Sequence, residues 1–314
     1  MRTTLTAVVA LSACTPAVDG QLLEASAYMN VEGATVYDVA YQSEGLRVNG
    51  MVAVPDAPGP HPLVWFNHGG FSGMRDEEVG DIGARAAELG AVVIASMYRG
   101  EGGSEGSVEY CLGEVSDVWN LGLAVEHLAP VERPGVAIGS SHGACISLML
   151  NARMAEAGTP LLSTVTLGTP SDVDTLVAWH YAEGDPQHAA RWEPYLRGPA
   201  NREMSPRFAD VAPPIVLLHG LDDHIVPVEQ GCLMRDAVAS TWPVRTHRVA
   251  GDGRPDGPAI PCLSDLDSGD PWAPLQDGLR LVAIEGTPHV PTEDTWQRAW
   301  EQVSQSLTYG STSN

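Results

Sequence analysis

The chain has 314 residues, of which 44% are hydrophobic and 18% are charged, so it can bury a large core and is not a disordered chain. Its 40 acidic residues stand against 17 basic ones, all of them arginine, which gives a formal net charge of −23. The absence of lysine excludes Schiff-base chemistry and nucleotide sites that depend on a lysine. The acidic excess argues against binding nucleic acid and against docking on an anionic membrane through a basic patch.

The first residues resemble a short bacterial secretion signal. Arg2 precedes an apolar run over residues 5–10, which is much shorter than the about 20 residues that span a membrane. The next four residues, Leu11-Ser12-Ala13-Cys14, resemble the lipobox of bacterial lipoproteins, in which the cysteine is lipidated. We therefore expect a signal peptide over residues 1–13, lipidation at Cys14 and export as a cell-envelope lipoprotein, periplasmic or anchored in the outer membrane. The alternative is an incidental cysteine in a Thr- and Ala-rich start.

Residues 14–33 are polar and show no clear periodicity, so we expect them to form a tether. Residues 46–54 then alternate between apolar and polar side chains, which is the spacing of a half-buried strand. Residues 34–42 are expected to pair with them as a hairpin around Ser43-Glu44-Gly45.

From residue 62 onward, short apolar runs alternate with helical patterns. This alternation is typical of a mainly parallel sheet that is covered by helices on both faces. We expect an α/β fold with about eight strands, in a single domain over residues 34–310. The expected strands after the hairpin are 63–66, 91–94, 136–138, 163–167, 215–218 and 281–284, and the expected helices are 76–89, 114–129, 142–156, 228–240 and 293–307.

Two segments interrupt the alternation. Residues 171–210 are rich in Trp, His, Pro and Arg, and we expect a cap in which Trp179 and Trp192 either line a substrate pocket or pack in a core. Residues 250–278 are rich in Gly, Pro and Asp and are expected to form an irregular insertion, directly after a strand expected at 243–249. Loops of this length are usually functional or mobile.

Four cysteines follow Cys14, and an even number in an exported protein permits disulfides. Cys145 falls in a helix that is expected to be buried, where a free thiol is common. Cys232 and Cys262 flank an irregular segment, and we expect these two to form a bridge. The spacing of the cysteines matches no zinc site.

The motif Gly139-Ser140-Ser141-His142-Gly143 follows an expected strand and begins an expected helix. This is the G-x-S-x-G pattern of a nucleophile elbow, in which a tight turn exposes the serine hydroxyl, here that of Ser141. A serine needs a histidine base that a carboxylate orients, and in this sheet architecture the order along the chain is serine, acid, histidine. After Ser141 the chain offers Asp222 or Asp223 as the acid and then His289 as the base, each shortly after an expected strand.

On these motifs the chain resembles the α/β-hydrolase superfamily, and within it the prolyl oligopeptidase and dienelactone hydrolase-like serine hydrolases. The family pattern H-G-x-x-D-x-x-V-P matches residues 219–227 and selects Asp223 over Asp222 as the acid, and G-x-x-H matches residues 286–289. Asn67-His68-Gly69-Gly70 resembles the family's oxyanion loop. The resemblance covers roughly residues 45–310, and it departs from the dienelactone hydrolases proper, whose nucleophile is a cysteine.

The resemblance implies a role for each of these residues. Ser141 would attack an acyl carbonyl, His289 would take its proton, and Asp223 would fix the imidazole tautomer. The oxyanion would bind the backbone amide of His142 and a second amide from the loop after His68, that of Phe71 or Gly70. No cofactor is required for this chemistry.

The remaining histidines have less specific interpretations. His68 and His219, like the ring of His142, are expected to be structural. A metal held in the cap by His180, His188 and Asp185 is an alternative, but isolated histidines in a polar loop are usually only solvated, so no metal is expected.

The sequence as a whole predicts a serine hydrolase that cleaves small or medium carboxylic esters through an acyl-enzyme. A serine peptidase of the prolyl oligopeptidase kind that acts on short peptides would use the same three residues, and a non-catalytic surface binding module is the alternative from another class. We expect a small-molecule or short-peptide substrate, no nucleic acid, and membrane contact only through the lipid at Cys14. The oligomeric state is not specified by these patterns.

Overall fold

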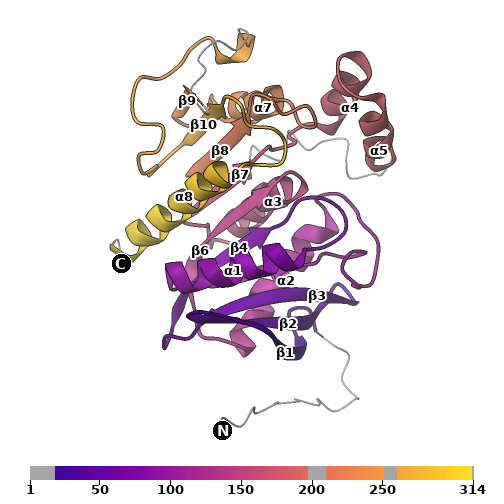
Figure 1. Cartoon of the computed structure of the whole chain (residues 1–314), viewed down its shortest axis with the longest axis vertical. Helices are drawn as coiled ribbons and strands as arrows, with labels where there is room; N and C mark the ends of the chain where they lie inside the picture. The colour runs from indigo at the N-terminus through magenta and orange to yellow at the C-terminus, as the bar shows by residue number, and fades with distance from the viewer. Residues whose placement is uncertain (1–17, 197–209, 251–259, 313–314) are drawn as a thin grey trace. The chain divides into compact units, whose positions relative to one another are not determined.

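The computed structural model describes residues 18–196, 210–250 and 260–312 (Figure 1). It divides into two compact units. The first comprises the chain up to Phe66 together with Phe71–Val108 and Gly113–Gly135. The second comprises Asn67–Gly70, Glu109–Leu112 and the chain from Val136 onward.

The strands of the first unit follow the order β1-β2-β3-β5-β4. The predicted hairpin is confirmed, since β2 and β3 pair antiparallel from Ala34 opposite Pro55 to Ser43 opposite Leu46. Strand β4 runs parallel to β5. The bounds are β1 (Leu22–Val31), β2 (Ala34–Ser43), β3 (Leu46–Pro55), β4 (His61–Asn67) and β5 (Val92–Ser96).

Strand β1 differs from the tether expected over residues 14–33. Residues 22–31 form a strand that pairs antiparallel with β2. Most β1 side chains are exposed or half-buried, because the strand lies at the edge of the sheet order. The strand signal was present in the sequence but was missed, because β1 alternates apolar residues at 23, 25, 27, 29 and 31 with Glu24, Ser26 and Asn30.

Helices α1 (Asp76–Leu89) and α2 (Gly113–Ala124) cover opposite faces of the strands of the first unit (Figure 1). The Gly83 backbone of α1 packs on Val36 of β2, whereas Leu121 of α2 packs at Gly50 of β3. Gly50 pairs with Val39, which lies three residues after Val36 along β2. Residues an odd number of positions apart in a strand point to opposite faces, so the two helices contact opposite faces of the sheet. A short 3-10 turn, Val125–His127, ends the helix predicted over 114–129.

The second unit contains five parallel strands in the order β6-β7-β8-β10-β9. The core strands β7, β8 and β10 are buried along their whole length, as expected for strands covered on both faces. Strand β9 confirms the expectation at 243–249, and with β1 it brings the described strands to ten. The bounds are β6 (Val131–Ser140), β7 (Ser163–Leu167), β8 (Ile215–Gly220), β9 (Val244–Val249) and β10 (Leu279–Ile284).

Helices α3 (His142–Glu156) and α8 (Glu293–Thr312) flank opposite faces of β7, and α7 (Val228–Val238) packs on β8 and β10 (Figure 1). Ser163 donates a hydrogen bond to Ser306 of α8 over 2.7 Å. The next residue of the strand, Thr164, accepts one from Asn151 of α3 over 2.8 Å. Adjacent strand residues point to opposite faces, so the predicted two-sided cover is confirmed.

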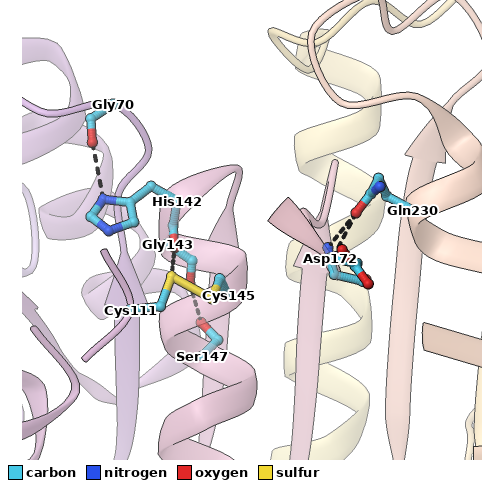
Figure 2. Close-up of a disulfide and its surroundings, with 9 residues drawn as sticks. Gly70, Cys111, His142, Gly143, Cys145, Ser147, Asp172 and Gln230 are labelled. Carbon is cyan, nitrogen blue, oxygen red and sulfur yellow. Dashed lines mark hydrogen bonds between the residues drawn. A yellow bond between two sulfur atoms is a disulfide. The ribbon is translucent and has the colours of Figure 1, made fainter. Parts of the chain in front are cut away.

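The expected cap is helical in its described part, α4 (Val173–Ala182) and α5 (Pro186–Leu196), and residues 197–209 lie outside the described ranges. Asp172 caps α4 by accepting from the Thr175 amide over 2.9 Å. The buried Gln230 of α7 accepts from the amides of Ser171 and Asp172, which ties the start of the cap to the sheet-packing helix α7 (Figure 2). In the insertion, residues 260–278 are irregular except for one 3-10 turn, Pro261–Leu263.

Two disulfides cross-link the second unit. Cys232–Cys262 confirms the predicted bridge. Cys145 also bonds to Cys111, so the expectation of a free thiol was wrong. The segment Glu109–Leu112 places the Cα of Cys111 at 6.0 Å from that of Cys145, a proximity that a sequence separation of 34 residues conceals.

The predicted signal peptide over residues 1–13 and the lipidation site Cys14 lie outside the described residues, and both remain predictions. Within the described part of the chain, we find no helix that combines the length and the apolar character needed to cross a membrane.

Candidate active site

Ser141 occupies a sharp turn between β6 and α3. Its φ of 52° and ψ of −120° lie outside the usual regions for a side-chain-bearing residue. A Cβ at Gly139 would lie 2.2 Å from the carbonyl oxygen of Gly143, and one at Gly143 would lie 2.0 Å from that of Asn67. Both glycines of the motif are therefore required by close backbone approaches, as a nucleophile elbow demands.

The three predicted catalytic side chains form a continuous hydrogen-bonded line. His289 Nε2 lies 2.9 Å from Ser141 Oγ, and His289 Nδ1 lies 2.8 Å from Asp223 Oδ2. An ionised carboxylate only accepts, so Nδ1 carries the proton and Nε2 accepts from the serine hydroxyl. Ser141 and His289 are half-buried, which leaves the serine open to a substrate.

The Asp223 carboxylate is 4% exposed and fully hydrogen-bonded. Its second oxygen, Oδ1, accepts from the amides of Ile225 and Val226 at 2.9 and 2.7 Å. Burial alone would raise the pKa of Asp223, but the hydrogen bond and charge of His289, with smaller contributions from His219 and Val226, lower the pKa overall. The acid therefore stays ionised and holds His289 in one tautomer.

Asp222, the alternative acid, does not reach the histidine. Its side chain is exposed, and its amide donates to the carbonyl oxygen of Thr287 over 3.2 Å. A Cβ at Gly220 would lie 2.1 Å from the same oxygen. The loops after β8 and β10 are thus joined directly through their backbones, which fixes Asp223 against His289.

Two of the residues expected to bind an oxyanion, His142 and Gly70, belong to the same unit as Ser141. His142 is the first residue of α3, so its amide is one of the N-terminal donors that have no partner within a helix, and the helix dipole favours negative charge there. Gly69 approaches the nucleophile closely, since a Cβ on it would lie 3.3 Å from Ser141 Cβ. Gly70 follows with a φ of 79°. Phe71 belongs to the first unit, and its role as a donor remains a prediction.

The ring of His142 is fully buried and hydrogen-bonded. Its Nδ1 lies 3.2 Å from the carbonyl oxygen of Gly70 (Figure 2). Burial lowers the pKa of His142 to about 4, against a smaller opposite effect of that hydrogen bond. The ring is therefore neutral at ordinary pH, and Nδ1 must carry its proton because a carbonyl oxygen can only accept.

Two neighbours of the site were missed in the sequence. Gly168 directly follows β7 and has a φ of 57°, and a Cβ on it would lie 3.2 Å from Asp223 Oδ2. A glycine directly after an apolar strand was an available signal. Tyr110 stacks on the ring of His142 with centroids 5.0 Å apart, and its only sequence signal was the adjacent Cys111.

His68 and His219 contact backbone carbonyls, as expected for structural residues. His68 Nδ1 lies 3.0 Å from Gly69 O, and His219 Nε2 lies 2.8 Å from Val226 O. His180 was expected to be solvated in a polar loop, but it is buried in helix α4, so that expectation was wrong. Its Nε2 lies 2.9 Å from Ile225 O, and its ring centroid lies 5.2 Å from that of His188. Among the residues that the structure describes, no group of three or more His, Cys, Asp or Glu side chains is arranged to hold a metal ion.

Several solved structures share the overall fold of this chain. Esterase Pf2001 of Pyrococcus furiosus matches with a TM-score of 0.58 and 16% identity, over 87% of this chain and 91% of its own. The rice cell wall degrading esterase LipA of Xanthomonas oryzae matches with a TM-score of 0.51 and 17% identity, over 71% of this chain and 88% of its own. This chain has the α/β-hydrolase fold.

Peptidases share this α/β-hydrolase fold as well. The acylaminoacyl peptidase of Pyrococcus horikoshii matches with a TM-score of 0.56 and 16% identity, over 88% of this chain and 40% of its own. Among curated proteins, the uncharacterized peptidase YtmA of Bacillus subtilis is 25% identical over 211 residues, which is 64% of this chain and 78% of that protein. No protein-family model matches the chain. The resemblance noted in the sequence agrees with these esterase and peptidase neighbours.

Proposed function

We propose that the protein is a serine hydrolase that cleaves carboxylic esters through an acyl-enzyme. The observation that carries this proposal is the unbroken line of hydrogen bonds from Ser141 through His289 to Asp223. Each side chain has the partner that its role needs, and the acid is buried while the nucleophile is accessible.

The geometry supports a two-step reaction. Ser141 Oγ attacks the ester carbonyl carbon while His289 Nε2 takes its proton, and the Asp223 carboxylate stabilises the resulting imidazolium. The tetrahedral oxyanion binds the His142 amide and an amide of the Gly70–Phe71 segment, and each such donor contributes about 10²–10³-fold to turnover. The alcohol leaves with the proton of His289, and water then releases the acid by the same steps in reverse.

A serine peptidase that acts on short peptides is the second candidate. The specific observation in its favour is that two of the similar proteins carry peptidase names. Two other solved neighbours are esterases, which favours the first candidate. A non-catalytic binding module is the less favoured reading, because all three catalytic side chains are in contact.

The test compares turnover of p-nitrophenyl acetate and butyrate with that of alanyl and prolyl p-nitroanilides, for the wild type and Ser141→Ala. We expect ester turnover to exceed amide turnover and the variant to lose several orders of magnitude. Faster amide turnover would make the protein a peptidase. Equal ester rates for the wild type and Ser141→Ala would contradict the mechanism.

We also propose that the protein is exported and anchored by lipid at Cys14. Two disulfides support export, because such bonds persist mainly in oxidising compartments. The mass of the mature amino-terminal peptide checks this: a diacylated or triacylated cysteine is expected, and an unmodified Cys14 would contradict it.

A further inference from the structure

The ring of His142 has no place in the proton transfers, yet it is fully buried within one residue of the nucleophile. Its Nδ1–H donates to the carbonyl oxygen of Gly70, over 3.2 Å. This hydrogen bond therefore joins the two parts of the proposed oxyanion site. His142 provides one backbone amide of that site, and Gly70 lies in the loop that is proposed to provide the second.

The covalent geometry of the peptide gives this hydrogen bond a consequence. A trans peptide is planar, with its carbonyl oxygen and amide hydrogen on opposite sides. The Gly70 carbonyl shares a peptide plane with the Phe71 amide, so a bond that fixes one fixes the direction of the other. The preceding carbonyl, that of Gly69, is held in the same way by His68 Nδ1 over 3.0 Å.

Packing gives Gly70 little restraint. It is exposed and has a φ of 79°. Apart from Gly70 itself and its two chain neighbours, no described residue has an atom within 4 Å of the position where its Cβ would lie. A glycine in a loop has the widest choice of backbone conformations. The hydrogen bond from His142 therefore has a restraining effect that side-chain packing does not supply.

The ring of His142 is itself held firmly. Tyr110 stacks on it with an interplanar angle of 9°, and Trp192 of α5 packs edge-on against Tyr110 at 5.0 Å. Tyr110 and Cys111 have φ values of 55° and 60°, a left-handed conformation that side-chain-bearing residues adopt rarely. The Cys111–Cys145 disulfide anchors this segment to α3 one turn beyond Ser141 (Figure 2).

We propose that His142 is a positioning residue for the oxyanion site: its ring, clamped by Tyr110, donates to the Gly70 carbonyl and so orients the Gly70–Phe71 peptide whose amide meets the developing oxyanion. This inference rests on the proposed serine hydrolase function. The sequence left two candidates for the second donor, the amides of Phe71 and Gly70, and this inference selects the Phe71 amide. The hydrogen bond matters most in the transition state, when the oxyanion forms.

The experiment compares His142→Asn, His142→Gln and His142→Leu. The Asn amide nitrogen takes the place of Nδ1, so it can donate to Gly70, whereas the Gln amide extends toward the position of Nε2 and Leu has no donor. We expect kcat for p-nitrophenyl butyrate to fall about 10–100-fold in the Leu and Gln variants, with KM within about twofold, and to stay within about threefold of the wild type in the Asn variant. Trifluoromethyl ketone affinity should fall in parallel with kcat/KM, because that adduct carries the oxyanion.

The outcomes separate this inference from the function on which it rests. Absence of any ester turnover in the wild type would contradict the proposed function alone. With an active wild type, unchanged kcat in His142→Gln, or equal losses in the Asn and Gln variants, would overturn the positioning role. Far-UV circular dichroism and a thermal melt verify that each variant is folded. If His142→Leu does not fold, the comparison of Asn with Gln still decides.

Discussion

At the residue scale, Ser141 combines backbone strain with the proposed chemistry. A positive φ at a side-chain-bearing residue costs about 1–3 kcal/mol, and the surrounding structure must hold it. The Ser141 amide donates to Leu167 of β7, and its carbonyl accepts from the Ala144 amide in the first turn of α3, both over 2.9 Å. The strand on one side and the helix on the other thus hold Ser141 in this conformation.

Glu101 is a second residue with an unusual environment, in the first unit. It is 3% exposed, and its Oε2 accepts from the Gly73 amide over 2.8 Å, while Oε1 has no hydrogen-bond partner among the described residues. Burial raises the pKa of Glu101 to about 7; the Gly73 hydrogen bond opposes this shift and the nearby Glu114 adds to it. The folded protein therefore favours the protonated form of this carboxyl.

Glu101→Gln should stabilise the protein in alkaline but not in acidic solution. Between the unfolded pKa, about 4.3, and the folded pKa near 7, the folded state binds the proton more tightly, so this carboxyl makes the free energy of unfolding fall as pH rises. Gln imitates the protonated acid and removes that loss, so we expect a gain on the order of 2–3 kcal/mol at pH 8 and a small change at pH 5.

Urea unfolding at the two pH values measures this gain. The exposed Glu32→Gln serves as the matched control and should change stability by less than about 0.5 kcal/mol at both pH values. Equal effects of Glu101→Gln at pH 5 and pH 8 would show that Glu101 is ionised throughout that range.

At the element scale, the segment Glu109–Leu112 joins packing to the proposed site. It carries Tyr110 against His142 and is fixed by the Cys111–Cys145 bond. The other disulfide, Cys232–Cys262, links α7 to the insertion. The two bridges have similar sequence separations, 34 and 30 residues, so they provide a matched pair.

The double variants Cys111→Ser/Cys145→Ser and Cys232→Ser/Cys262→Ser should lose similar stability but differ in activity. Loop-closure entropy predicts a loss of about 3–4 kcal/mol for each. Only the first variant frees Tyr110, so we expect its kcat to fall about tenfold while that of the second stays within about twofold. Ester kinetics below both melting temperatures provide the comparison. Equal kcat values for the two variants would show that the Cys111–Cys145 bond does not support the active site.

At the scale of the whole molecule, the sequence predicted the parts whose signal is local. Buried parallel strands such as 215–218 read as continuous apolar runs because both of their faces are covered. The proposed catalytic residues follow β6, β8 and β10, and parallel strands of one sheet bring their carboxyl ends to the same edge. Chain order and strand ends were therefore sufficient to bring together Ser141, the pair Asp222 and Asp223, and His289, and the family pattern then selected Asp223.

The features that escaped prediction depend on contacts between distant residues. Strand β1 is an exception, because its own sequence alternates between apolar and polar residues from Leu23 to Val31 and this local signal was missed. The partner of Cys145 is decided by where the 109–112 segment lies, and the stacking of Tyr110 on His142 follows from the same placement. Gly168 carried a local signal, but its proximity to Asp223 depends on the pairing of β7 with β8.

Covalent labelling of the folded protein by a fluorophosphonate probe, followed by peptide mass spectrometry, tests the central claim most directly. The probe reacts with a serine only where a base activates it and an oxyanion site binds the phosphoryl oxygen. We predict one equivalent of label, on Ser141, and none in Ser141→Ala. A folded wild-type protein that takes up no label, or takes it up on a residue other than Ser141, would contradict the account.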